Sequence, residues 1–181
     1  MEKVQGVFDE NLVIKKAQLS EGMKIADLGC GYTGRFTFPM AKLVGRSGLV
    51  YAVDAKKEVL VSIAKLAKRE NLSNIKTIWS NLEIFKATKI ESSSVDVALL
   101  MNILFQSQKR AEIIREAVRL LKKDCRLVIV EWNKTAALFG PPVASRISKE
   151  NLKNSLSKAG LKLEEEFEPG PYHYGLVCIK V

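Results

Sequence analysis

Apolar residues recur along this chain with two alternating periods. Short, nearly continuous apolar runs are typical of buried strands, and they occur at residues 23–28, 48–53, 75–79, 95–100 and 126–130. Apolar residues at helical spacing predict helices at residues 36–44, 59–66 and 111–121. Strands that alternate with helices in this way indicate a parallel sheet covered by helices on both faces.

The C-terminal part of the chain has a different pattern. Ser148 is suited to cap a helix that runs to about residue 159, and Gly160 is suited to end it. Two strand-like segments follow at residues 161–167 and 172–181. The residues that join them, 168–171, are too few for a crossover between parallel strands, so the last strand must run antiparallel.

Together these elements predict the fold class. We expect an α/β fold with a doubly wound, Rossmann-like sheet of seven strands, mostly parallel and with an antiparallel last strand. No internal repeat, low-complexity tract or linker divides the chain. Residues 1–181 are therefore expected to form a single domain.

The cysteines and the apolar runs bear on the cellular compartment. The three cysteines, Cys30, Cys125 and Cys178, lack the close spacing of metal ligands, which argues against a zinc site or a disulfide framework. The N-terminus lacks a long apolar core, and no run of about 18 uncharged apolar residues occurs. We expect a cytoplasmic protein with no membrane span and no metal site.

The chain is basic, with a formal net charge of +9. Such a charge is compatible with an anionic partner such as nucleic acid. The lysines and arginines are however scattered at helical spacing in residues 56–69 and 109–123, and glutamates are mixed among them. Mixed charge of this kind is ordinary on solvated helix faces, so nucleic acid is not favoured as the partner.

Candidate chemistry gathers after the first two predicted strands. The first is followed by the turn Asp27-Leu-Gly-Cys-Gly31, with Gly34 beyond it, and the second ends in Asp54. A strand, a glycine-rich turn, a helix and a strand ending in a carboxylate form the first half of a nucleotide-binding α/β domain. Asp54 is placed to accept hydrogen bonds from vicinal ribose hydroxyls, and it can also cap the helix that follows.

Two nucleotide ligands fit this spacing. The glycines satisfy the dinucleotide fingerprint G-x-G-x-x-G, which suggests a dehydrogenase. Asp27 argues against that ligand, because a carboxylate beside the turn opposes a pyrophosphate, which needs bare amides and a helix N-terminus. The sulfonium and ammonium of S-adenosylmethionine are instead favoured by an anion at this position.

The chain resembles the class I S-adenosylmethionine-dependent methyltransferases over nearly its whole length. The resemblance rests on the Asp27–Gly31 turn, on Asp54, on Ser80-Asn81-Leu82 after the third strand and on the antiparallel end of the sheet. More narrowly, the chain looks like small methyltransferase-domain proteins similar to the ubiquinone and menaquinone biosynthesis methyltransferases. This subgroup implies a fold and a cofactor, S-adenosyl-L-methionine, and no substrate.

The resemblance also implies where the cofactor binds. In the family the glycine-rich turn holds the methionine part, the residue at Asn81 faces the adenine amino group, and Leu82 offers its amide to the ring. Relatives usually carry aspartate at the position of Asn81, whose amide oxygen can still accept that bond. The predicted cofactor-binding residues are Asp27, Gly29, Cys30, Gly31, Asp54, Ala55, Asn81, Leu82 and Asn102. Simpler roles stay open: packing for Cys30, and loop or turn residues for Asn81 and Asn102.

Methyl transfer from a sulfonium is an in-line displacement, so catalysis can come mainly from holding the acceptor at near-attack distance. A base is needed only for a hydroxyl or a protonated amine, and His173 is the only histidine. His173 and Arg146 are the candidate substrate contacts, the latter for an anionic acceptor, although packing of His173 and surface exposure of Arg146 are the simpler interpretations. Trp132 and Phe139 are candidates for an apolar acceptor pocket or for the core.

Our sequence-based hypothesis is a methyltransferase that acts on a small-molecule acceptor. No Asn/Asp-Pro-Pro-Tyr/Phe motif follows the fourth strand, which reads Asn102-Ile-Leu-Phe105, and this disfavours methylation of adenine or glutamine amino groups. One alternative is an RNA or protein methyltransferase, supported only by the basic charge. The other is a non-catalytic protein that binds S-adenosylmethionine or S-adenosylhomocysteine. The sequence carries no signal for the oligomeric state.

Overall fold

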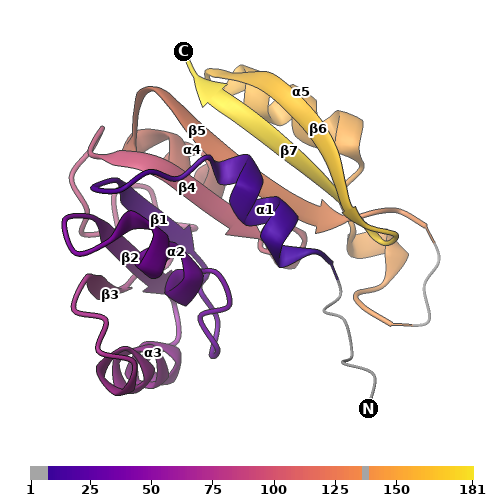
Figure 1. Ribbon diagram of the computed structural model, residues 1–181. Coiled ribbons are helices and arrows are strands. Elements are labelled where there is room, and N and C mark those ends of the chain that lie inside the picture. Colours follow the sequence, from indigo (N-terminus) through magenta and orange to yellow (C-terminus); the bar gives the residue numbers. More distant parts are fainter. Residues whose placement is uncertain (1–7, 136–138) are drawn as a thin grey trace.

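The computed structural model describes residues 8–135 and 139–181, in which seven strands form one sheet in the order β3-β2-β1-β4-β5-β7-β6 (Figure 1). The strands are β1 (Lys24–Leu28), β2 (Leu49–Asp54), β3 (Ile75–Trp79), β4 (Val95–Met101), β5 (Leu121–Trp132), β6 (Leu161–Gly170) and β7 (His173–Lys180). Strands β1 to β5 pair in parallel, and β7 is antiparallel to both β5 and β6. The predicted fold class, including the antiparallel last strand, is confirmed.

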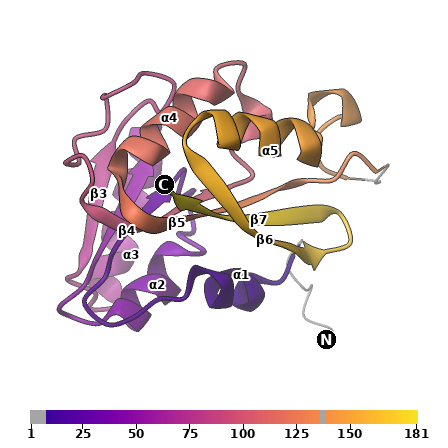
Figure 2. The same ribbon diagram turned by 90° about the horizontal axis from the view of Figure 1, so that it is seen from above.

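Helices cover both faces of this sheet, as Figures 1 and 2 show from two directions. One face carries α1 (Glu10–Ala17), α2 (Thr37–Val44) and α3 (Lys57–Arg69), and the other carries α4 (Arg110–Leu120) and α5 (Lys149–Lys158). Two short 3₁₀ turns, η1 (Leu104–Gln106) and η2 (Val143–Ser145), complete the regular structure of the described residues. Strand residues alternate between the cores on the two faces, which is why the strands read as nearly continuous apolar runs.

The helix boundaries follow the local sequence. Ser148 caps α5 by accepting a hydrogen bond from the amide of Asn151, as predicted. Helix α2 ends at Gly45, whose φ of +66° favours glycine. Helix α1 was not expected, although Asp9 accepts a hydrogen bond from the amide of Leu12 and caps it in the ordinary way. None of the described helices is long and apolar enough to cross a bilayer.

Two strand boundaries differ from the prediction. Strand β5 begins at Leu121 instead of 126, because Leu121 pairs with Val95 and residues 122–125 form an irregularity before Arg126 pairs with Val97. Strand β6 continues through 168–170 to Gly170, with a second irregularity in its pairing, so only residues 171 and 172 link it to β7. Neither difference changes the order or direction of the strands.

The topology places a crevice at one edge of the sheet. The strand order runs outward from β1 through β2 to β3 on one side and through β4 to β5 on the other. The connections therefore reverse direction between β1 and β4, and a crevice opens there at the carboxyl ends of the strands. The predicted glycine-rich turn after β1, Asp54 at the end of β2 and Asn102 after β4 all lie at this edge.

Candidate functional site

A cavity of about 530 Å³ lies at the carboxyl ends of the strands on both sides of this reversal point. Seven of the predicted cofactor-binding residues line it: Gly29, Gly31, Asp54, Ala55, Asn81, Leu82 and Asn102. Wall residues that the sequence analysis did not single out include Tyr32, Lys56, Glu83, Met101, Gln106 and Ser107, and Ser80 of the motif after β3 also lines the cavity. They lie at or after the ends of β1 to β4, so the positions of the strand ends are the signal that would have identified them.

The glycine-rich turn presents bare backbone to this cavity. The amides of Gly29 and Cys30 donate to the carbonyl of Val53, which ties the turn to the end of β2. Gly31 has a φ of +66°, and a Cβ there would meet no atom within 4 Å, so the backbone is open on that side. A Cβ on Gly29 would instead overlap Ile103. The turn therefore offers a cradle that a side chain would fill.

Cys30 and Asp27 do not belong to the described wall of the cavity. Cys30 is buried among Ala52 and Ile63 in the core beneath α3. Burial raises the pKa of its thiol, so the thiol is protonated at neutral pH and unsuited to nucleophilic chemistry. The structure thus favours a packing role for Cys30, which was the simpler interpretation of the sequence.

Asp27 lies behind the turn with only 2% of its surface exposed. Burial raises the pKa of its carboxyl to about 6, and the negative charge of Asp54 adds to this effect. The hydroxyl of Thr37 opposes the rise by donating a hydrogen bond of 2.6 Å to Asp27 Oδ2. Close to neutral pH the carboxylate is ionised and weakly compensated, which makes this part of the site attractive to a cation.

Asp54 organises the turn as well as facing the cavity. Its Oδ2 accepts a hydrogen bond of 3.2 Å from the amide of Gly31, and its Oδ1 accepts one of 3.0 Å from the amide of Lys56. The first bond fixes the cradle, and the second supports the start of α3. The second bond is an Asx-type turn to the N-cap residue Lys56 and does not cap α3, whose first turn has no side-chain cap. Each carboxylate oxygen can accept a further bond from a ligand.

Asn81 and Leu82 follow the end of β3, whose last residue, Trp79, pairs with Asp54. Asn81 Oδ1 accepts a hydrogen bond of 2.9 Å from the amide of Glu83, an Asx turn that orients the carboxamide. Leu82 is buried and anchors the segment in the core. Glu83 accepts a hydrogen bond of 2.6 Å from the Ser107 hydroxyl and so connects this wall to the residues after β4.

Asn102 links the cavity to His173. It has a left-handed φ of +55°, which is uncommon outside glycine and costs about 1 kcal/mol. Its Nδ2 lies 3.2 Å from His173 Nε2. Asn102 Oδ1 and His173 Nδ1 are buried and have no hydrogen-bond partner among the described residues. Unpaired buried polar atoms at a sheet edge of this kind call for a further polar partner.

Glu131 holds the segment after Asn102 in place. Its Oε1 accepts hydrogen bonds from the amides of Leu104 and Phe105, while Gln106 Nε2 donates to the Asn102 carbonyl. Burial raises the pKa of Glu131 to about 7, although these backbone bonds oppose the rise. The sequence analysis missed this residue, since a glutamate inside a strand gives no periodic signal.

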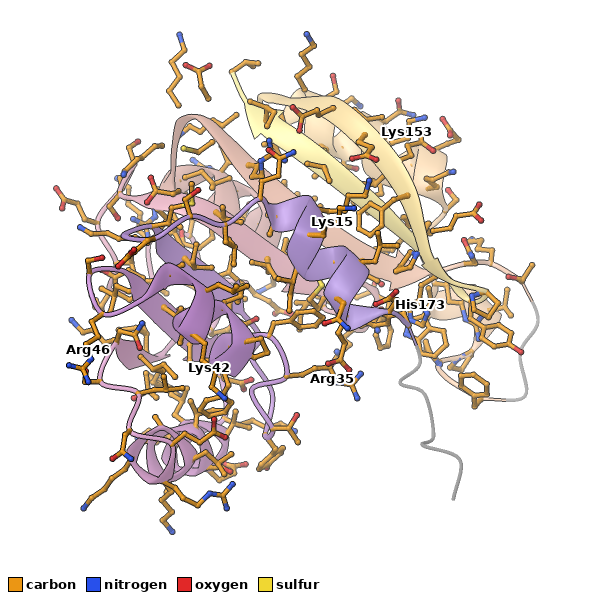
Figure 3. All side chains as sticks on the ribbon, in the orientation of Figure 1. Lys15, Arg35, Lys42, Arg46, Lys153 and His173 are labelled. Carbon is orange, nitrogen blue, oxygen red and sulfur yellow. The ribbon has the colours of Figure 1, made fainter. Side chains whose placement is uncertain are left out.

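His173 is fully buried within a group of aromatic rings (Figure 3). Its ring centroid lies 4.1 Å from that of Trp132 and 4.9 Å from that of Phe8. Burial, with a smaller contribution from the positive charge of Arg146, lowers the pKa of His173 to about 4. The imidazole is therefore neutral across the physiological range. His173 does not line the cavity, but its Nε2 contacts the side chain of Asn102, which does.

Arg146 holds a loop together and does not face the cavity. Its guanidinium donates hydrogen bonds to the carbonyls of Asn133, Thr135 and Pro141, and only 3% of its surface is exposed. A side chain committed to three carbonyls is poorly placed to bind an anionic acceptor. Arg146 also lies over the Trp132 ring. Because the residue is buried, the simpler prediction that Arg146 is a surface arginine is wrong as well.

The described residues contain no group of three histidine, cysteine, aspartate or glutamate side chains that could hold a metal ion. Cys30 follows β1, Cys125 lies near the start of β5, and Cys178 is buried in β7. These positions keep the three thiols on separate elements of the fold.

With this geometry established, comparison with known proteins decides the family. A family profile described as a methyltransferase domain matches residues 19–169. The chain belongs to the methyltransferase domain family. Membership of the class I S-adenosylmethionine-dependent methyltransferases is thereby confirmed, and with it the expected cofactor, S-adenosylmethionine.

Individual relatives agree with this assignment. The chain is 34% identical over 108 residues to an arsenite methyltransferase from Aquipseudomonas alcaligenes, which covers 58% of this chain and 31% of that protein. It is 34% identical over 111 residues to a demethylmenaquinone methyltransferase from Lactococcus lactis, covering 61% and 42% respectively. The chain thus spans less than half the length of these two curated relatives.

A solved structure matches over nearly the full length. The crystal structure of a SAM-dependent methyltransferase from Aquifex aeolicus superposes with a TM-score of 0.86 and 25% identity, covering 97% of this chain and 91% of that one. The methyltransferase fold therefore extends through the C-terminal hairpin of β6 and β7.

Proposed function

We propose that this methyltransferase-family protein binds S-adenosylmethionine in the 530 Å³ cavity and transfers its methyl group to a small-molecule acceptor by in-line displacement. The observation that carries the proposal is the convergence of the glycine cradle, Asp54 and Asn102 on one cavity at the reversal point of the sheet. When bound, the cofactor supplies a methyl group activated by a sulfonium.

The chain's own residues fit this ligand. The open backbone at Gly31 admits the close approach of a flexible chain, and Asp54 offers acceptors for ribose hydroxyls. Asp27 supplies a buried negative charge behind the turn, where it favours a cationic group and disfavours a pyrophosphate. Asn81 Oδ1 has an acceptor position left beside its bond to Glu83 for an adenine amino group.

The aromatic edge of the sheet supports an uncharged acceptor with apolar surface. The exposed ring of Phe139 packs edge to face against Trp132, at the end of β5, and against Tyr172, directly before β7. The neutral His173 and its partner Asn102 provide unpaired polar atoms beside them. Because Arg146 is bound to loop carbonyls, an anionic acceptor is less well served.

The two curated relatives act on different acceptors, an arsenite in one and a demethylmenaquinone in the other. Soft thiolate ligands suit a metalloid, yet the three cysteines of this chain lie on separate elements. The apolar edge therefore favours an organic acceptor. We further propose that residues 1–181 form one domain that works in the cytoplasm, in keeping with three free thiols.

RNA or protein is the second candidate acceptor, favoured by the net charge of +9. Three of the basic side chains labelled in Figure 3 are however paired with carboxylates: Arg35 with Glu10, Lys42 with Glu70 and Lys153 with Glu150. These contacts reduce the charge available to a polyanion, and we rank this candidate lower. Salt-dependent retention on immobilised RNA would reverse the ranking.

Calorimetric titration with S-adenosylhomocysteine, with reduced nicotinamide dinucleotide as the control ligand, tests the proposed cofactor site. We expect micromolar binding of the first and no binding of the second. Binding of the dinucleotide alone would show that the Asp27 carboxylate does not exclude a pyrophosphate. Tight cofactor binding without turnover across a broad panel of organic acceptors would favour the non-catalytic alternative.

The protonation state of His173 can be measured without knowing the acceptor. Because it is the only histidine, its imidazole gives one set of NMR signals. We expect no titration between pH 5 and 8 and a midpoint near pH 4, since burial disfavours the charged form. A midpoint between about 6 and 7 would instead identify an accessible imidazole suited to general base catalysis. Because the pKa of His173 is lower in the folded state than its ordinary value of 6.5, the contribution of His173 to stability decreases as the pH drops from about 6.5 to about 4.

A further inference from the structure

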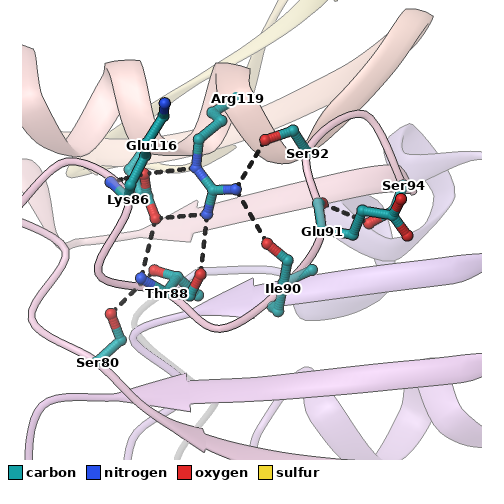
Figure 4. A network of polar contacts seen from close by, with 9 residues as sticks. All are labelled: Ser80, Lys86, Thr88, Ile90, Glu91, Ser92, Ser94, Glu116 and Arg119. Atoms are coloured by element: carbon teal, nitrogen blue, oxygen red, sulfur yellow. Dashed lines mark hydrogen bonds and ion pairs between the residues drawn. The ribbon is translucent and has the colours of Figure 1, made fainter.

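The segment that joins β3 to β4, residues 80–94, is held by two side chains of α4. Glu116 and Arg119 project from this helix toward the segment, as Figure 4 shows. The same segment carries Asn81 and Leu82 on the cavity wall. Any residue that fixes its backbone therefore also fixes one wall of the cofactor site.

The contacts form a closed network. Glu116, which is fully buried, accepts hydrogen bonds of 2.8 Å from the amide of Lys86 and 3.1 Å from the amide of Thr88. Arg119 donates bonds of 3.0 Å to the carbonyls of Thr88 and Ile90, and the two side chains pair at 2.7 Å. Both charges are thus satisfied by the segment's backbone and by each other.

Two details connect this network to the cavity. Lys86 has a left-handed φ of +65°, a strained conformation for a lysine, and Glu116 binds its amide. The Thr88 hydroxyl lies 2.9 Å from that of Ser80, the residue directly before Asn81. A path of direct contacts therefore runs from Glu116 through Thr88 and Ser80 to the wall (Figure 4).

The ion pair is a permanent feature at neutral pH. Burial alone raises the pKa of Glu116, but hydrogen bonds from Arg119, Lys86 and Thr88 outweigh it and hold the pKa below its usual value. A buried ion pair contributes little net stability compared with apolar residues of the same volume. The main effect of the Glu116–Arg119 pair is therefore to fix the backbone geometry of residues 80–94.

We propose that the Glu116–Arg119 pair is a positioning device that gives the cofactor site its selectivity for adenine. By fixing the backbone of residues 80–94, it holds the Asn81 carboxamide and the Leu82 amide in the register that matches the edge of adenine. The inference rests on the proposed placement of adenine against these two residues. Neither Glu116 nor Arg119 lines the cavity.

The test compares S-adenosylhomocysteine with S-inosylhomocysteine, in which an oxo group replaces the adenine amino group. In the unmodified protein we expect at least about tenfold tighter binding of the adenine ligand, because the analogue has no amino group to donate to Asn81 Oδ1 and places an oxo group there instead. Glu116→Gln replaces two acceptor sites of a carboxylate by one and should weaken S-adenosylhomocysteine binding about tenfold. Binding of the analogue should change by less than about twofold, so the discrimination disappears.

Glu150→Gln is the matched control. Glu150 also pairs with a basic residue three positions along its helix, Lys153, at 3.1 Å, but on α5. Its replacement should leave both affinities unchanged. Thermal unfolding of each variant shows whether the fold is retained, and Arg119→Lys, which keeps the charge and loses the paired carbonyl contacts, serves if Glu116→Gln does not fold.

A second substitution separates positioning from general destabilisation. Adding Lys86→Gly to Glu116→Gln should restore much of the discrimination, because glycine adopts the left-handed conformation without strain. Unaltered discrimination in Glu116→Gln would overturn the inference. An unmodified protein that binds both ligands equally would instead overturn the placement of adenine on which the inference rests.

Discussion

Replacing Asp27 with asparagine is expected to stabilise the cofactor-free protein by of order 3 kcal/mol at pH 7.5 and to weaken cofactor binding at least about tenfold. The two effects have opposite signs because the buried carboxylate destabilises the cofactor-free fold but attracts the cationic groups of the cofactor. Denaturant unfolding measures the first effect, and calorimetric titration with S-adenosylmethionine measures the second.

The stability change follows from the pKa of Asp27. Burial raises this pKa from an ordinary value of 3.8 to about 6, so between these values the folded state binds more protons than the unfolded state. The contribution of Asp27 to stability is therefore most favourable at low pH and decreases as the pH rises through this window. A neutral asparagine, which can still accept the Thr37 hydroxyl bond, avoids the whole penalty.

The affinity change follows from the charge of the ligand. A sulfonium and an ammonium stabilise the ionised form of Asp27, so binding releases the proton that the free site holds at low pH. The affinity of the unmodified protein should fall as the pH drops below about 6, and the asparagine variant should lose this dependence. At pH 5 the two proteins should bind nearly alike.

Asp96→Asn is a contrasting control at the opposite edge of the sheet. Asp96 accepts hydrogen bonds from the Lys24 amide and from Lys122 Nζ, so its loss should lower stability and leave cofactor affinity unchanged. A pH-independent affinity in the unmodified protein would show that Asp27 does not sense the bound cofactor.

The sheet was predictable because its strands are buried on both faces. Runs such as residues 95–100 have no polar alternation, and the short link before β7 leaves antiparallel entry as the only geometry. The positions of Gly31, Asp54 and Asn102 on the cavity were predictable for the same reason. Strand ends of a parallel sheet meet at one edge, so residues that follow them converge.

The parts that were missed depend on contacts between segments far apart in the sequence. The residues around Arg146 in the sequence give no sign of what it binds. In the fold, its guanidinium donates hydrogen bonds to the carbonyls of Asn133 and Thr135. Glu116 occupies a helix position that looks solvated, and only the return of residues 80–94 buries it. Asp27 was expected to point toward the turn, whereas in the structure it is buried and accepts a hydrogen bond from the Thr37 hydroxyl.

Replacing Asp54 with alanine is expected to weaken cofactor binding between about tenfold and a hundredfold. Hydrogen bonds to a charged acceptor contribute about 1.5–3 kcal/mol, and each tenfold change in affinity corresponds to about 1.4 kcal/mol. The variant loses the acceptor for the ribose and also the bond that holds the Gly31 amide in the cradle.

Folding should be affected much less, because the lost bond to the Lys56 amide is exposed and contributes about 1 kcal/mol to stability. Asp54→Asn keeps one carbonyl oxygen and should give an intermediate affinity. Glu58→Gln, an exposed acidic position in the first turn of α3, controls for the general loss of negative charge and should bind normally. If Asp54→Ala binds S-adenosylhomocysteine as tightly as the unmodified protein, Asp54 serves only the turn and the helix start, and the ribose must lie elsewhere.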